Sequence, residues 1–129
     1  GSWEGRIDSR DLRLDVNAVV VKDGVTTLTL TVTNTGSTST YGWMNAFGDF
    51  SMLSSGVKLV DVQNRLVYSP GKGENGACMC SGYDNSALEA GASRSVYTTF
   101  KELPEGVTAI DVKIEGITEP FENIPVTRE

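Results

Sequence analysis

Leu12-Arg13-Leu14-Asp15-Val16-Asn17 and Leu28-Thr29-Leu30-Thr31-Val32-Thr33 are the two stretches that decide the fold class of this 129-residue chain. In both, apolar and polar residues alternate with a period of two, as in a strand with one face buried and one in water. Lys22-Asp23-Gly24 lies between them, and Asp-Gly is a strong signal for a hairpin turn. The threonines at 27, 29, 31 and 33 are β-branched and favour an extended outer face. We therefore predict an antiparallel hairpin here.

Further strands are predicted along the rest of the chain. Residues 57–62 and 65–68 flank Gln63-Asn64, which predicts a second tight hairpin. Residues 93–100 and 110–114 alternate again and predict two later strands. Because no convincing amphipathic helix occurs, about seven strands in all predict an all-β, immunoglobulin-like antiparallel β-sandwich.

The two ends of the chain carry separate signals. Gly1-Ser2 looks like a cloning remnant, so we expect residues 3–129 to form a single domain. Residues 120–126 contain two prolines, which cannot donate to a strand ladder. This segment is therefore predicted to be an edge segment or a docked tail.

Composition excludes several classes of function. The formal net charge is −6, with six cations against seven carboxylates through Arg65 and five against ten after it. The electrostatic field of this excess negative charge repels phosphate backbones, so nucleic acid is not expected as a partner. No stretch approaches the roughly 20 apolar residues that span a bilayer, so direct membrane insertion is not expected. The absence of histidine removes the commonest general base and metal ligand, which argues against an enzyme.

Cys78-Met79-Cys80 is the most unusual motif. On an extended strand, residues i and i+2 have Cα atoms roughly 6.5 Å apart, near the upper limit for a disulfide. Gly76 and Gly82 could permit the bend that a bridge needs. We favour a disulfide between Cys78 and Cys80 in an oxidising compartment over two reduced thiols. A metal site is the least favoured, because no histidine or third cysteine completes a tetrahedral set.

The cysteines lie in a long polar, glycine-rich excursion, residues 72–92. Its carboxylates, amides and tyrosine could line a ligand-binding loop, and oxygen ligands of this kind can hold calcium. The spacing fits no EF-hand pattern, however, so a solvated loop is the favoured interpretation. The candidate loop residues are Glu74, Asn75, Tyr83, Asp84 and Asn85, with Glu89 added for calcium.

Aromatic residues form the next candidate group. Trp43 and Phe47 share one face of an extended segment that also contains Tyr41 and Phe50. A buried tryptophan is common in β-sandwiches, so we favour core packing over a ligand-binding face. Trp3 is expected either to be disordered or to pack over an open end of the core.

Several short sequence motifs occur in this chain in the same combination as in a known family. They are the Leu28–Gly36 strand and loop, Tyr68 before a glycine-rich loop, Cys78-Met79-Cys80-Ser81, Leu88-Glu89-Ala90-Gly91 before Tyr97-Thr98-Thr99-Phe100, and the closing Pro120-Phe121-Glu122-Asn123-Ile124-Pro125-Val126. The combination resembles the N-terminal extracytoplasmic module of actinobacterial OmpA-family cell-envelope proteins. The resemblance implies an exported, secreted or membrane-anchored protein of longer sequence, with a peptidoglycan-binding OmpA-like domain next to this module.

The leading functional prediction is a non-catalytic interaction or spacer module that takes no cofactor. Its expected partner is another protein or a cell-wall component. The alternative is a secreted ligand- or metal-binding domain that uses the loop 72–92. A thiol-disulfide enzyme is less favoured, because the acidic surroundings of the cysteines should raise a thiol pKa.

Overall fold

The computed structural model describes residues 1–7, 9–43, 56–71, 79–80 and 86–129. Within these ranges the regular structure is all β, which confirms the predicted fold class. The eight strands are β1 (Ser2–Ile7), β2 (Arg10–Lys22), β3 (Val25–Asn34), β4 (Val57–Asp61), β5 (Leu66–Tyr68), β6 (Ser93–Lys101), β7 (Ala109–Ile114) and β8 (Phe121–Arg128).

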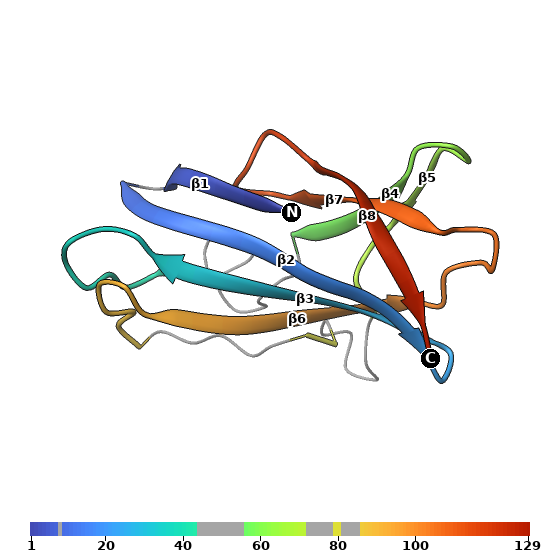
Figure 1. The fold of residues 1–129 in the computed structure, drawn as a ribbon, viewed down its shortest axis with the longest axis horizontal. Helices are drawn as coiled ribbons and strands as arrows, with labels where there is room; N and C mark the ends of the chain where they lie inside the picture. Colours follow the sequence, from blue (N-terminus) through green and yellow to red (C-terminus); the bar gives the residue numbers. More distant parts are fainter. Residues whose placement is uncertain (8, 44–55, 72–78, 81–85) are drawn as a thin grey trace.

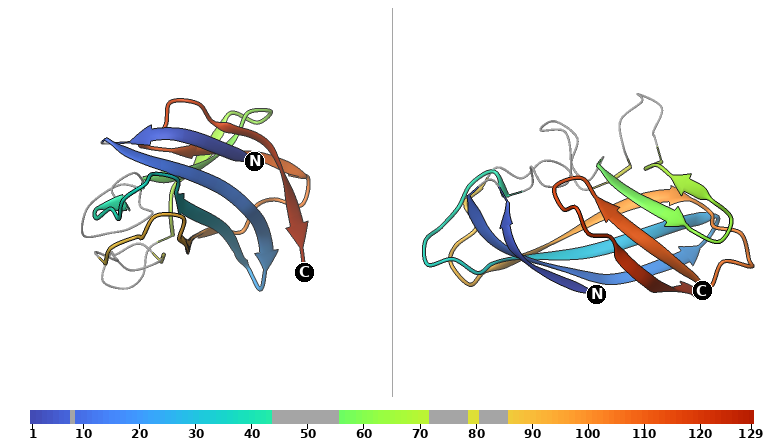
Figure 2. Two further views of the ribbon diagram at one scale, coloured as in Figure 1. Left: turned by 60° about the vertical axis from the view of Figure 1, so that its left-hand side comes forward. Right: turned by 90° about the horizontal axis from the view of Figure 1, so that it is seen from above.

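The strands form one curled sheet in the order β5-β4-β7-β8-β2-β3-β6, with β1 paired to β2 as a branch (Figure 1). The curl brings two layers face to face, which gives the sandwich-like cross-section in Figure 2. β2 pairs with β3 along nearly its whole length, and its other edge is shared between β1 and β8. The sheet is mixed, because β2 and β8 run parallel at Val19–Val21 and Val126–Arg128, so the expectation of purely antiparallel pairing is wrong at this junction.

The β2–β3 hairpin has the predicted turn. Lys22 pairs with Val25, which leaves Asp23 and Gly24 as a two-residue loop. Both have positive φ, 52° and 81°, and this combination defines a type I′ turn. On β3 the even-numbered residues from Thr26 to Asn34 are buried, and the threonines at 27, 29, 31 and 33 lie on the outer face as predicted.

The β4–β5 hairpin is also present, but its loop is longer than predicted. β4 ends at Asp61 and β5 begins at Leu66, so the loop has four residues instead of the tight turn expected at Gln63-Asn64. The buried Asp61 explains the difference, because its Oδ1 accepts from the Asn64 backbone N–H at 3.2 Å and its Oδ2 from the Asn64 side-chain amide at 2.7 Å. Arg65 closes the loop with φ of 57°.

The C-terminal strand corrects a second prediction. Residues 121–128 form β8, which lies between β7 and β2 instead of at an edge. Pro125 is tolerated there because the neighbouring Val126 N–H donates to β7, at Thr108 O (2.9 Å), and because the pairing of β8 with β2 begins only at Val126. The Asn123 backbone N–H bonds to the Asp111 carboxylate at 3.0 Å instead of to the ladder.

The core fills the space between the two layers. Among the described residues, 24 apolar side chains are buried in one cluster, which draws on all eight strands, with Ile7 alone from β1, and on the connecting turns. Trp43, only 2% exposed, belongs to this cluster, which confirms its predicted core role. Trp3 lies in β1 and packs partly buried against the cluster. No helix within the described ranges is long and apolar enough to cross a membrane.

Candidate functional site

Asn34, at the end of β3, holds the base of the 72–92 excursion, which we call the cysteine segment. Its side chain is buried, and its Nδ2 donates to the carbonyl oxygens of Leu88 at 2.8 Å and Thr38 at 2.9 Å. Its Oδ1 accepts from the Gly36 N–H at 2.9 Å. Its backbone bonds to the same segment, through Ala92 O at 3.0 Å and Gly91 N–H at 2.8 Å. One amide therefore ties β3 to the C-terminal part of the cysteine segment.

Leu88 and Ser86 provide two further contacts to the chain that follows β3. Leu88 is fully buried and exchanges both backbone hydrogen bonds with Thr40, at 2.8 and 3.0 Å. The indole Nε1–H of Trp43 donates to the carbonyl oxygen of Ser86 at 3.1 Å. The described C-terminal part of the segment is thus hydrogen-bonded at three points and packed into the core.

Met79 and Cys80 attach the segment to β6. Cys80 pairs with Thr98 as an isolated antiparallel bridge. The Met79 carbonyl oxygen accepts from the Thr99 backbone N–H at 3.0 Å and from the Thr99 hydroxyl at 2.6 Å. Met79 N–H donates to Gly71 O at 2.8 Å, and Gly71 N–H donates to Thr99 O at 2.7 Å. Met79 and Cys80 therefore continue the sheet beyond β6 with the register of a short added strand.

The structure places only part of the predicted site. Cys78 and all five candidate loop residues (Glu74, Asn75, Tyr83, Asp84 and Asn85) lie outside the described residues, as do Phe47 and Phe50. No cysteine among the described residues is a free thiol, and the pairing of Cys78 with Cys80 stays a prediction. Tyr41 is 65% exposed and does not join Trp43 in the core.

The predicted calcium residue Glu89 is exposed and lies at the turn that Ala92 N–H closes onto Glu89 O at 2.9 Å. Across the described ranges, no three histidine, cysteine, aspartate or glutamate side chains gather closely enough to hold a metal ion.

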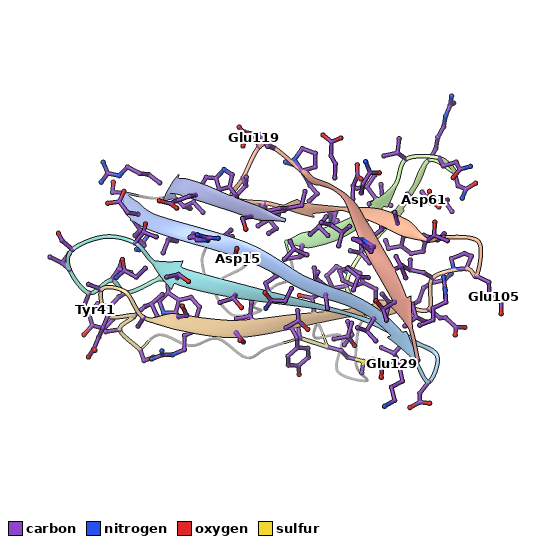
Figure 3. All side chains as sticks on the ribbon, viewed as in Figure 1. Asp15, Tyr41, Asp61, Glu105, Glu119 and Glu129 are labelled. Atoms are coloured by element: carbon purple, nitrogen blue, oxygen red, sulfur yellow. The ribbon has the colours of Figure 1, made fainter. Side chains whose placement is uncertain are left out.

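Asp15, on the outer face of β2, is a carboxylate whose pKa its neighbours change (Figure 3). The Ser2 hydroxyl donates to Asp15 Oδ1 at 2.5 Å, and Arg13 Nε lies 3.2 Å from Oδ2. The hydrogen bond from Ser2, with a smaller contribution from Arg13, lowers the pKa of Asp15 below its usual value. Gly1 O also accepts from Val16 N–H at 2.8 Å, so both residues expected as a cloning remnant take part in the β1–β2 pairing.

Comparisons with known proteins leave the family undecided. The chain matches no protein-family model, and it matches no curated protein. The resemblance to actinobacterial OmpA-family envelope modules therefore stays a prediction from the sequence.

Proposed function

We propose that this domain is a non-catalytic interaction or spacer module of an exported cell-envelope protein, and that its partner is another protein or a cell-wall component. The observation that supports the proposal best is the double attachment of the cysteine segment, to β6 through Met79 and to β3 through Asn34. Binding segments are commonly loops held by a sheet in this way.

The attachment explains how the module would present the cysteine segment. Thr99 holds Met79 with two hydrogen bonds, because its backbone N–H and its hydroxyl both donate to the Met79 carbonyl oxygen. Asn34 and Leu88 fix the other end in the core. A disulfide between Cys78 and Cys80 would add a local clip of about 1.5–2 kcal/mol in the chain-entropy model. In the proposal, the sheet therefore holds Met79, Cys80 and residues 86–92 of the segment in place.

The sequence of the full-length gene tests the proposal. We expect an export or lipoprotein signal ahead of this domain and a wall-binding domain beside it. A full-length chain that lacks any export signal would contradict the proposal.

The alternative, a secreted ligand- or metal-binding domain, depends on loop residues outside the described ranges, so no contact in the structure favours it. Calorimetry with Ca(II), Zn(II) and Cu(I), run on the oxidised and reduced protein, decides between the two. Saturable binding of any of these ions by the folded domain would support the alternative.

A further inference from the structure

The β4–β5 hairpin exposes an unusual share of the apolar surface. Seven large apolar side chains are exposed among the described residues, and three of them (Val62, Leu66 and Val67) lie in this one hairpin, at 66%, 48% and 60%. Scattered exposed apolar residues need no explanation, but a cluster of them marks an interaction surface. We call these three residues the hairpin patch; Leu66 and Val67 are neighbours on β5, so the patch covers both faces of this sheet edge.

The patch adjoins a sheet edge that is open in the described part of the chain. β5 is the last strand of the sheet order and pairs only with β4. In an antiparallel sheet, the backbone groups of successive residues face the neighbouring strands alternately. Because Glu115 N–H donates to Gly56 O at 3.1 Å, the backbone groups of the even-numbered residues of β4 face β7, and those of the odd-numbered residues face β5. The partners of Leu59 and Asp61 are Tyr68 and Leu66, so the N–H and C=O of Val67 point away from β4. The edge thus offers a donor and an acceptor to an incoming strand.

Three cations surround the patch. Lys58 lies on the outer face of β4 beside Val60, whose cross-strand partner is Val67. Arg65 directly precedes Leu66 in the turn, and Lys101 lines a hollow of about 320 Å³ together with residues 66–69 and Gly71. All three side chains are exposed and carry no ion pair in the described part of the chain. Unpaired cations around an apolar edge are complementary to an acidic partner.

We propose that the β5 edge binds an extended acidic segment of a partner protein, which adds a strand to the sheet and places its side chains beside Val67 on one face and Leu66 on the other. This inference rests on the proposed function, since it names the class of partner that an interaction module would take. The outward N–H and C=O of Val67 favour a peptide over a lipid surface, because lipid tails cannot satisfy backbone groups. A second copy of the chain is disfavoured, because edge-to-edge pairing would bring two sets of the same cations together.

The test is a titration of the ¹⁵N-labelled domain with a short peptide of alternating valine and glutamate. We expect shift changes concentrated at residues 66–69 and new exchange protection of the Val67 amide. The double variant Arg65→Glu/Lys101→Glu should weaken binding about tenfold, since two exposed charge contacts are lost. The matched control Arg94→Glu reverses an exposed cation at the opposite end of β6, seven residues along the strand from Lys101, and should leave the affinity unchanged.

Four results would overturn the proposal. They are no shift at β5, equal binding of a valine–lysine peptide, an affinity that the double variant leaves intact, and binding of phosphatidylglycerol vesicles in place of the peptide. Any of them would leave the exported interaction module standing if the gene carries an export signal. If the gene lacks an export signal and the domain still binds the peptide, the assignment to the cell envelope is wrong, but the binding site at the β5 edge is supported.

Discussion

The Asn34→Ala variant should cost about 3 kcal/mol of unfolding free energy. It removes the bonds from Nδ2 to Leu88 O and Thr38 O and the bond from Gly36 N–H to Oδ1. The bond to Leu88 is buried, and a buried group left without a partner costs about 1–3 kcal/mol. The other two bonds are partly buried, so water can replace them in part, at about 0.5 kcal/mol each. For a domain of this size, the sum lowers the melting temperature by about 12 °C.

Asn17→Ala is the matched control, because the chemical change is the same at an exposed site. Asn17 Nδ2 donates to the Thr31 hydroxyl at 2.6 Å, where water can take its place. We expect this variant to lose less than about 0.5 kcal/mol. Urea denaturation, followed by tryptophan fluorescence, measures both variants under the same conditions.

Hydrogen exchange locates the effect. In Asn34→Ala, the amides of Leu88 and Gly91, which bond to Thr40 O and Asn34 O, should lose protection before the amides of β2 and β3 do. The reasoning is refuted if Asn34→Ala is as stable as Asn17→Ala, or if both amides keep wild-type protection. Either result would mean that Asn34 does not hold the cysteine segment.

Three further predictions concern the turn, the surface carboxylate and the loop. Gly24→Ala should lose about 1 kcal/mol because Gly24 has φ of 81°, whereas Gly106→Ala, at a position with open space and no positive φ, should be neutral by thermal denaturation. Asp15→Asn should be less stable than the wild type by about 0.5 kcal/mol at neutral pH. Because the folded pKa of Asp15 is lowered, the contribution is present above its unfolded value and is lost as the pH falls through the folded value, so the urea midpoints of the two proteins should converge as the pH falls through the folded pKa. Calorimetry of the oxidised protein with Ca(II) should show no saturable heat, and a stoichiometric signal would move the function toward the ligand-binding alternative.

The β2–β3 hairpin was predictable because the alternation of apolar and polar residues and the Asp23-Gly24 turn signal both indicate the same hairpin. The alternation fixes the inner face of β3, and Asp23-Gly24 supplies two residues that tolerate positive φ. The bulge between Val16 and Ala18 was not predictable, since it moves the buried face of β2 from even to odd residues. Val19, Val20 and Val21 are all apolar, so the pattern there does not reveal the change.

Asn34 and Asp61 show which signal the sequence contains for buried polar residues. Each is in phase with the apolar residues of its strand, at the last position before the chain turns. A polar side chain at such a position faces inward, where it bonds the backbone of the turn that follows. This role of Asn34 was not predicted from the sequence. The position of Asn34 in the alternating pattern of β3, and not its polarity, is the signal that identifies this role.

The central position of β8 depends on information that is not local. Two prolines favour an edge, and only the parallel pairing of Val126–Arg128 with β2 shows that the strand joins the two layers. The attachment of Met79 to Thr99 is equally nonlocal, because it forms between backbone groups that carry no sequence signal. The candidate site was therefore recognised by its cysteines, while its attachment to the sheet was not.

The claim that the domain belongs to an exported protein with a clipped cysteine segment is tested most directly by counting thiols. The protein is produced in an oxidising compartment, denatured without reductant, alkylated and weighed by mass spectrometry. We predict that neither cysteine is alkylated and that both become alkylated only after reduction, as the proposed disulfide between Cys78 and Cys80 requires. Two alkylated cysteines without reduction would contradict the claim.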